Sequence, residues 1–241
     1  MSHSPDTVAA VLQLRQEGLG ARRISARTGV PIATIAEWLR GNTPQQPTAC
    51  PHCRRPEDLP PEYVYLLGMY LGDGCISTHP RTYKLRIKLD VRYPQIVAEC
   101  ERAMRAVMPS NRVRRLTREG SWSEVYAYSR HWPCVFPQHG LGRKHSRPIE
   151  VTNWQIPLIM AAPEQFLRGL IHSDGCRFEN TGRNGWRAPR YSFSNRSEDI
   201  RILFCWVCEL LGLHWTEAPH TIYVSRKADV ARMDEFIGPK A

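Results

Sequence analysis

The apolar positions between residues 6 and 40 predict three short helices. The first lies around residues 8–14, the second covers residues 21–28, and the third covers residues 31–40 and is opened by a proline. Four apolar side chains would lock the second and third helices at a steep angle about Gly29: Ile24, Val30, Ile35 and Trp38. This pattern predicts a small all-α helix-turn-helix domain over residues 1–42.

The outward face of the third helix contains the side chains that would enter a DNA major groove: Ala33, Thr34, Glu37 and Arg40. This face is poor in Arg, Asn and Gln, which make most of the specific contacts with base edges. A small helical adaptor that does not touch DNA therefore remains an alternative for this domain.

Residues 43–61 interrupt the helical pattern with six prolines: Pro44, Pro47, Pro51, Pro56, Pro60 and Pro61. Because proline disfavours both helix interiors and central strands, this stretch is expected to be a semi-rigid linker. We place the domain boundary there. The linker also contains a Cys-x-x-Cys pair at Cys50 and Cys53.

From residue 62 onward the pattern predicts helix, two strands, helix, two strands and helix, and then repeats. In the first copy we expect strands near residues 83–89, 112–117 and 122–129, and helices at 94–108 and from about 131. In the second copy we expect strands near residues 176–180, 190–195, 214–217 and 221–225, and helices at 197–211 and 228–237. This order predicts an α+β fold.

The strand at residues 83–89 alternates with a period of two. Its apolar side chains are Tyr83, Leu85, Ile87 and Leu89, and its basic side chains are Lys84, Arg86 and Lys88. Further cations lie on other predicted strand and loop positions: Arg81, Arg92, Arg183, Arg187, Arg190 and Arg196. We expect one packed face and one basic face that suits a phosphate backbone. A solvated basic face without a ligand is the alternative.

Two segments, residues 65–75 and 166–176, end in the same three letters, Asp-Gly-Cys. Each begins after a Pro-Glu pair and continues for about three apolar turns. Asp73 and Asp174 then follow at helix C-termini, where carbonyl groups are already negative. A cation would stabilise this arrangement, so the repeated motif predicts one divalent metal site shared by both carboxylates.

Small residues at helical spacing would let these two helices meet. They are Gly68 and Gly72 in the first segment, and Gly169 and Ser173 in the second. Close approach would bring Asp73 and Asp174 together, and two adjacent carboxylates need a proton or a metal between them. Since Asp-Gly is also a common turn dipeptide, each motif alone is compatible with an ordinary turn after a core helix.

The two segments resemble the paired signature helices of the LAGLIDADG homing endonuclease family in its single-chain form. The matching positions are Leu66, Gly68, Asp73 and Gly74 in the first copy, and Leu167, Gly169, Leu170, Ile171, Asp174 and Gly175 in the second. The earlier acidic position of the signature holds Leu71 and His172 here. The resemblance implies that this position is variable and does not bind the metal.

The resemblance also implies a pseudo-twofold duplicated αββαββα fold, with repeats at about 62–150 and 163–241 in a domain spanning 62–241. Its two sheets would form a saddle over double-stranded DNA. Asp73 and Asp174 would be the catalytic metal ligands, helped by carbonyl groups at the helix ends. A lysine near the active site in each half would correspond to Lys144 and Lys240, and both could equally be solvated surface charges.

Composition agrees with a polyanionic partner. The 241 residues contain 33 Lys plus Arg against 23 Asp plus Glu, a formal charge of +10. No apolar run reaches the roughly 18 residues of a membrane-spanning helix, which favours nucleic acid over a membrane. The start lacks the features of a secretory signal, so we expect a cytoplasmic protein, associated with the nucleoid in a prokaryote. The oligomeric state is left open, and a monomer is compatible with the sequence.

The eight cysteines are expected to be thiols or metal ligands rather than disulfides. Cys50 and Cys53 have the spacing of half a structural zinc site, and Cys205 and Cys208 could complete it. Their apolar neighbours Phe204, Trp206 and Val207 favour buried core thiols instead.

Three functions follow from these patterns. The first is a site-specific, Mg²⁺-dependent DNA endonuclease that hydrolyses phosphodiester bonds. The second is a non-catalytic DNA-binding transcriptional regulator that has kept the same scaffold. The third is a protein-interaction scaffold without a nucleic acid partner, which predicts no salt-dependent retention on DNA.

Overall fold

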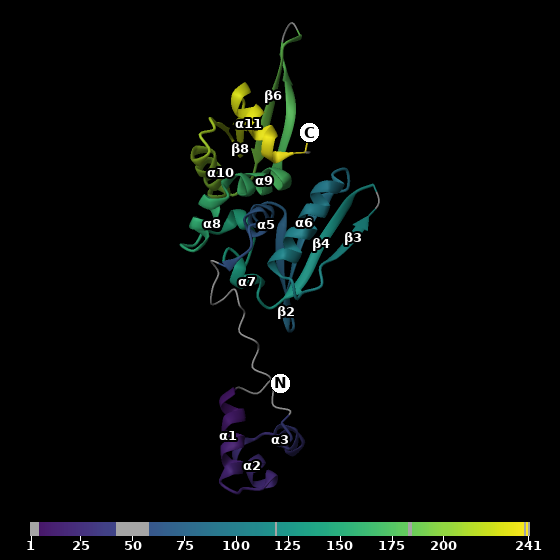
Figure 1. Ribbon diagram of the computed structural model, residues 1–241, viewed down its shortest axis with the longest axis vertical. Coiled ribbons are helices and arrows are strands. Elements are labelled where there is room, and N and C mark those ends of the chain that lie inside the picture. The colour runs from purple at the N-terminus through teal and green to yellow at the C-terminus, as the bar shows by residue number, and fades with distance from the viewer. Residues whose placement is uncertain (1–4, 42–57, 119, 183–184, 239, 241) are drawn as a thin grey trace. The chain divides into compact units, whose positions relative to one another are not determined.

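The computed structural model describes residues 5–41, 58–118, 120–182, 185–238 and 240 (Figure 1). The chain divides into two compact units, Met1–Cys50 and Pro51–Ala241. Each unit has its own hydrophobic core. In the part of the chain that the structure describes, no helix is both long and apolar enough to cross a lipid bilayer.

The N-terminal unit contains the three predicted helices: α1 (Pro5–Gln16), α2 (Ala21–Thr28) and α3 (Ile32–Leu39). Its core is formed by Val11, Ile24, Val30, Ile35 and Trp38. Gly29 takes the left-handed conformation, with φ of 70°, and its amide donates to the Ser25 carbonyl. This backbone geometry favours glycine and ends α2, so that α3 can turn back across it.

The larger unit contains the same series of elements twice, with α8 (Gln155–Ala161) between the two copies. The first repeat comprises α5 (Glu62–Leu71), β1 (Gly74–His79), β2 (Thr82–Asp90), α6 (Pro94–Val107), β3 (Arg114–Arg118), β4 (Trp122–Ser129) and α7 (Trp132–Val135). The second comprises α9 (Pro163–Asp174), β5 (Gly175–Thr181), β6 (Arg187–Ser194), α10 (Glu198–Leu210), β7 (Thr216–Ala218), β8 (Thr221–Val224) and α11 (Lys227–Ile237).

Two four-stranded antiparallel sheets confirm the α+β fold class. The strand orders β1-β2-β4-β3 and β5-β6-β8-β7 are equivalent, so the chain takes the same path through both. Each sheet buries one face beneath helices. In the first sheet the covered side includes Leu85, Ile87, Val125 and Ala127, and in the second it includes Tyr191, Phe193, Ile222 and Val224. The period-two pattern of residues 83–89 predicted this correctly for β2.

Helices α5 and α9 lie against each other at the centre of the larger unit (Figure 1). Every residue of α5 after Glu62 is buried. A Cβ atom on Gly68 would lie 2.6 Å from the Phe166 carbonyl oxygen, and one on Gly169 would lie 2.3 Å from the Tyr65 carbonyl oxygen. Both distances are shorter than van der Waals contact, so glycine is what lets the two backbones approach. The predicted seam of small residues is confirmed.

The remaining differences are local. Helix α8 was not predicted, because Pro157 falls inside a short apolar run that does not show a clear helical period. Strand β3 begins at Arg114 rather than near residue 112, and β7 covers Thr216–Ala218 rather than residues 214–217. Both are edge strands, where few contacts fix the point at which pairing begins.

Candidate functional site

Asp73 and Asp174 lie at the ends of the two packed helices, as the repeated motif predicted. Asp174 Oδ2 lies 3.1 Å from the position that a Cβ atom on Gly72 would occupy, one residue before Asp73. Asn195, which follows β6, donates from Nδ2 to the same Asp174 oxygen at 2.7 Å. Asp73 keeps contact with solvent, and Asp174 is half-buried. The helix packing therefore brings the Asp174 carboxyl group to the residue that precedes Asp73, close enough for its charge to act on Asp73.

The protonation equilibria of both carboxyl groups reflect this crowding. Asp73 is exposed as a whole residue, but protein atoms crowd its carboxyl group. This desolvation, and then the charge of Asp174, raises the pKa of Asp73 from 3.8 to about 6, against the opposing effect of Lys240 and Lys144. Burial also raises the pKa of Asp174, while the hydrogen bond from Asn195 and the two lysines lower it. The pair is therefore costly to ionise fully, and a bound cation would relieve that cost.

Lys144 and Lys240 cap the two helices in the same way. Lys144 Nζ donates to the carbonyl oxygens of Tyr70, Leu71 and Gly72 at 2.5, 2.8 and 2.7 Å. Lys240 Nζ donates to those of Ile171, His172 and Ser173 at 2.9, 2.8 and 2.9 Å. These carbonyl groups occupy equivalent positions in the two helices, offset by 101 residues like Asp73 and Asp174. The lysines are thus pseudo-symmetric C-terminal caps beside the two acids.

This capping changes the electrostatic argument that the sequence suggested. The cation needed at each helix C-terminus is an ammonium group of the chain itself. Two carboxylates and two ammonium groups cancel formally, and the two helix ends add roughly half a negative charge each. A net negative charge of about one unit remains, which fits one added cation. Its attraction for that cation is weaker than that of the uncompensated carboxylate pair that the sequence predicted.

The donor atoms fit a hard divalent metal. Carboxylate and carbonyl oxygens are the ligands that Mg²⁺ prefers, and Mg²⁺ sites often contain only one or two carboxylates with water completing the shell. The carbonyl oxygens of Gly72 and Ser173 each accept a hydrogen bond from a lysine ammonium group, but each oxygen has a second lone pair. Among the described residues, no group of three or more His, Cys, Asp or Glu side chains is arranged to hold a metal ion.

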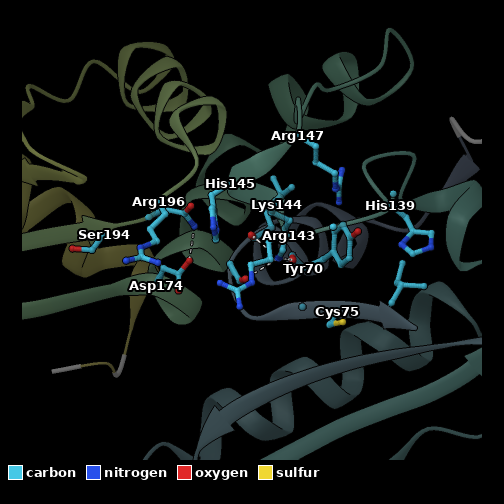
Figure 2. A pocket seen from close by; sticks show the side chains of 17 residues that line it. Tyr70, Cys75, His139, Arg143, Lys144, His145, Arg147, Asp174, Ser194 and Arg196 are labelled. Atoms are coloured by element: carbon cyan, nitrogen blue, oxygen red, sulfur yellow. Dashed lines mark hydrogen bonds between the residues drawn. The ribbon is translucent and has the colours of Figure 1, made fainter. Parts of the chain in front are cut away.

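A pocket of about 510 Å³ opens beside Asp174, and Asp73 is not among the residues that line it. Figure 2 shows Asp174 and Arg196 at one side of it and Lys144 and Arg143 near its centre. Tyr70 and Arg147 lie toward the other side. Burial raises the pKa of the Tyr70 hydroxyl to about 12, and the neighbouring Arg147 opposes the rise. The pocket combines the C-terminal end of α5 and the Asp174 carboxyl group with several cationic side chains. Such an environment suits a phosphodiester group.

Several lining residues were not identified from the sequence: Tyr70, His139, Arg143, His145, Arg147 and Asn195. A signal for four of them was present, because residues 139–147 concentrate basic side chains around Lys144. No pattern in the sequence pointed to Asn195. Its role depends on the sheet bringing the end of β6 back to the end of α9.

His172, at the position where the family signature carries an acid, is a buried structural residue. Its Nε2 donates to the Ile237 carbonyl at 2.8 Å, which makes Nδ1 the acceptor for the Tyr65 hydroxyl at 3.0 Å. Burial lowers the pKa of His172 to about 4. The neutral ring therefore ties α5, α9 and the end of α11 together just before Lys240.

The uncovered face of the first sheet is strongly basic. Strand register places five cations on it: Lys84, Arg86, Lys88, Arg114 and Arg118. The same face contains Trp122, Tyr126 and Tyr128. Lys84 is partly neutralised by an ion pair with Glu124 at 2.7 Å, in which the side chains are only 17% and 6% exposed. The other four cations form the basic face that the sequence predicted from β2 alone.

The uncovered face of the second sheet differs. Register places Cys176, Phe178, Asn180, Arg190, Ser192, Ser194, Thr221 and Tyr223 on it. Arg190 stacks over the Tyr223 ring at 5.2 Å. Arg187 falls on the same side as Tyr191 and pairs with Glu179 at 3.2 Å, so it does not belong to this face. Arg183 lies outside the described residues. Arg196 is exposed and lines the pocket.

In the N-terminal unit, the predicted recognition residues are accessible. Ala33 and Arg40 are exposed, and Thr34 and Glu37 are half-buried. Arg40 Nη2 pairs with Glu37 Oε1 at 2.6 Å, and the two side chains are 66% and 47% exposed. Contact with DNA stays a prediction for these four residues.

The cysteine arrangement is described only in part. Cys208 is fully buried in the core, Cys205 is half-buried, and burial raises the pKa of both thiols. These are features of core thiols. Cys50 and Cys53 lie outside the described residues, so the four-cysteine zinc site stays a prediction.

Comparison with known proteins gives no match to a protein-family model and no match to a curated protein. Among solved structures, I-DmoI in complex with DNA and Ca is 15% identical, with 73% of this chain and 88% of that chain covered and a TM-score of 0.49. The LAGLIDADG meganuclease I-AabMI bound to uncleaved DNA is 12% identical, with 72% and 82% covered and a TM-score of 0.45. Full-length DUF199/WhiA from Thermatoga maritima is 14% identical, with 77% and 60% covered and a TM-score of 0.47. Similarity at this level carries no argument about function, which must come from the residues of this chain.

Proposed function

We propose that this protein binds double-stranded DNA and hydrolyses phosphodiester bonds with the help of Mg²⁺, as a LAGLIDADG-type endonuclease. The observation that carries the proposal is the convergence of Asp73 and Asp174 at the ends of two glycine-packed helices. Two carboxyl groups held together with raised pKa values are a recurrent feature of metal-binding and catalytic sites. An ordinary pair of helix-ending turns has no need to bring them together.

Asp73 and Asp174 would hold the metal, with the carbonyl groups of Gly72 and Ser173 as further oxygen donors. Bound Mg²⁺ would supply an activated water and positive charge for the oxyanions that develop during phosphodiester hydrolysis. Asn195 keeps one Asp174 oxygen in a fixed position through its 2.7 Å hydrogen bond. Such an outer partner orients a ligand and normally affects metal affinity.

The cations of the pocket would bind the reacting phosphate. Arg143, Arg147 and Arg196 line the space beside Asp174, and guanidinium groups recognise phosphate oxygens through paired hydrogen bonds. Lys144 and Lys240 act differently, since their ammonium groups are engaged by three carbonyls each. They would hold the helix ends in place and so set the separation of the two acids.

The basic sheet face would supply affinity for the DNA backbone. The cations of the first sheet lie in the same compact unit as the pocket, and the formal charge of the chain is +10. Contacts with phosphates contribute affinity without sequence information, and they make binding salt-dependent. The helix-turn-helix of the N-terminal unit would add further DNA contacts through α3.

Selection of bound DNA followed by a cleavage test examines this proposal directly. Purified protein would select duplexes from a random library, and the selected sites would be cloned into a plasmid and incubated with Mg²⁺. We expect cleavage by the wild type, and none by Asp73→Asn or Asp174→Asn at equal site occupancy. Cleavage that survives both substitutions would remove the acid pair from the mechanism.

A second candidate is a non-catalytic DNA-binding regulator. The observation that favours it is the double lysine cap, because two ammonium groups already offset the two carboxylates without a metal. In the same experiment this candidate predicts selective, salt-dependent DNA binding with no nicking at any selected site. Absence of salt-dependent DNA retention would instead favour the protein-interaction scaffold.

A further inference from the structure

A second concave surface lies on α10, in the second repeat, and shares no residue with the Asp174 pocket. It has a volume of about 300 Å³. Its apolar lining is Ile202, Cys205, Trp206 and Trp215, and its acidic lining is Glu198, Glu209 and Glu217. We refer to this surface as the α10 groove. It runs along roughly three turns of the helix and continues to the edge strand β7.

The apolar side chains on the outer side of α10 are partly or largely accessible to solvent. Ile202 is 58% exposed, and Leu210, about two turns further along the helix, is 42% exposed. Trp206 and Trp215 pack against the core only in part. The opposite side of α10 packs in the hydrophobic core, where it buries Ile200, Phe204 and Val207. This helix therefore has an apolar outer stripe that the fold of the chain leaves in contact with water.

The first repeat shows that the fold does not require this stripe. When the buried positions of α6 and α10 are superposed, so that Ile96 matches Ile200 and Val107 matches Leu211, Arg102 takes the position of Trp206. In the same alignment Arg105 takes the position of Glu209. The equivalent helix of the duplicated unit thus has a charged outer face of mixed sign, with Glu99 and Glu101 beside Arg102 and Arg105. The aromatic and acidic character of α10 is specific to the second repeat.

The charge of the groove is opposite to that of the whole chain. Three glutamates face one guanidinium, Arg201, which lies 3.6 Å from Glu217. Burial, followed by the charges of Glu217 and Glu209, raises the pKa of the Cys205 thiol to about 11. In a chain with a formal charge of +10, such a surface repels nucleic acid and attracts a cationic partner.

We propose that the α10 groove is a docking site for a basic amphipathic helix of a partner protein. An amphipathic helix lays apolar side chains, spaced three and four residues apart, into a groove of this kind. Its aliphatic anchors would contact Ile202, Trp206 and Trp215, and lysine or arginine residues flanking them would pair with Glu198, Glu209 and Glu217. Tryptophan is among the residues that contribute most to such interfaces.

A peptide titration tests the proposal. The probe is a synthetic amphipathic Leu/Lys helix about 14 residues long, close to four turns, and the matched control peptide replaces every Lys by Glu. Indole N–H signals of the full-length protein are followed by NMR, with Trp206→Phe and Trp215→Phe used to assign the two groove signals. We expect saturable shifts of these two signals with the Lys peptide and no saturable shifts with the Glu peptide.

Variants supply the matched controls. Ile202→Glu is expected to weaken binding of the Lys peptide by about tenfold or more, since it places a charge at the centre of the contact. Glu209→Lys is expected to weaken it about fivefold through charge repulsion. Arg102→Glu, at the corresponding position of α6, should leave it unchanged. Ile202 is exposed, so the melting temperature and DNA retention of Ile202→Glu should match the wild type.

Three outcomes would overturn the proposal. The first is the absence of saturable shifts at Trp206 and Trp215 with the Lys peptide. The second is equal binding of both peptides, which would indicate a non-selective apolar surface. The third is a self-association of the free protein that Ile202→Glu abolishes in sedimentation experiments, because the groove would then be covered by a second copy of the chain.

Discussion

The two repeats of the larger unit share a backbone but differ in what they present to solvent. The uncovered face of the first sheet has five cations, and that of the second is made mainly of hydroxyl, amide and aromatic groups around Arg190. The outer helices differ as well, because α6 has equal numbers of acidic and basic side chains, whereas α10 is acidic and aromatic. Duplication fixed the packing of the helices and strands, while the surfaces diverged.

Each repeat supplies one member of the acid pair, and substitutions in this pair have the largest expected effect. We predict that Asp73→Asn and Asp174→Asn each reduce Mg²⁺-dependent cleavage by at least about 10³-fold, since each removes a metal ligand. Single-turnover cleavage of a selected site measures the loss.

Asn195→Ala serves as the graded control, because it removes the outer partner of Asp174 and leaves the ligand in place. The expected reduction is about 10-fold to 100-fold. A strong effect of one aspartate alone would mean that the two halves are not equivalent in the chemistry.

The first sheet, with its basic face, should contribute more to DNA binding than the second sheet. We predict that the triple variant Arg86→Gln, Lys88→Gln and Arg114→Gln weakens DNA binding by about 30-fold. It should also reduce the slope of log K against log salt by about 2 to 3 units, close to 0.9 per lost phosphate contact. Fluorescence anisotropy at several salt concentrations measures both quantities.

Arg190→Gln in the second sheet should change that slope by about one unit or less. Equal slopes for the variants of the two sheets would contradict the electrostatic difference between them. A change in sequence preference without a change in slope would assign the second sheet to base recognition.

The lysine caps should contribute similarly to both halves. Lys144→Met and Lys240→Met each leave three carbonyl groups at a helix end without their charged donor. We expect each substitution to lower the free energy of unfolding by about 1 to 3 kcal/mol. Urea denaturation measures this, with Lys144→Arg as a control that retains the charge. No loss of stability in either variant would show that water replaces the ammonium group without cost.

The smallest expected effect is the pH dependence of stability at Asp73. Its pKa is raised to about 6 in the folded protein, so the folded state binds a proton more tightly than the unfolded state. This contribution is present below the unfolded value near 3.8 and is lost as pH rises through 6.

Asp73→Asn should therefore be more stable than the metal-free wild type above pH 6, by about 1 kcal/mol because solvent screens the exposed side chain. Below pH 4 the advantage should disappear. Urea denaturation of both proteins in EDTA at pH 8 and pH 4 provides the measurement. Equal stability at pH 8 would show that neither burial nor the charge of Asp174 disfavours the ionised Asp73 carboxylate.

The sequence by itself determined the elements and their duplication. Alternation along residues 83–89 predicted which side of β2 is buried, and the spacing of Gly68 and Gly169 predicted the helix contact. These features depend on local periodicity and on the absence of side chains, both of which are readable along the chain. The approach of Asp73 and Asp174 followed from them.

Only the tertiary structure decided how charge is compensated. The sequence assigned the cation at the helix ends to a metal, whereas Lys144 and Lys240 reach those carbonyls across separations of about 70 residues. The contact of Asn195 with Asp174 likewise depends on where β6 ends in the folded sheet. The groove on α10 depends on the position of β7 beside that helix. Hydrogen bonds and ion pairs between distant residues require a particular arrangement of elements, and no local pattern records that arrangement.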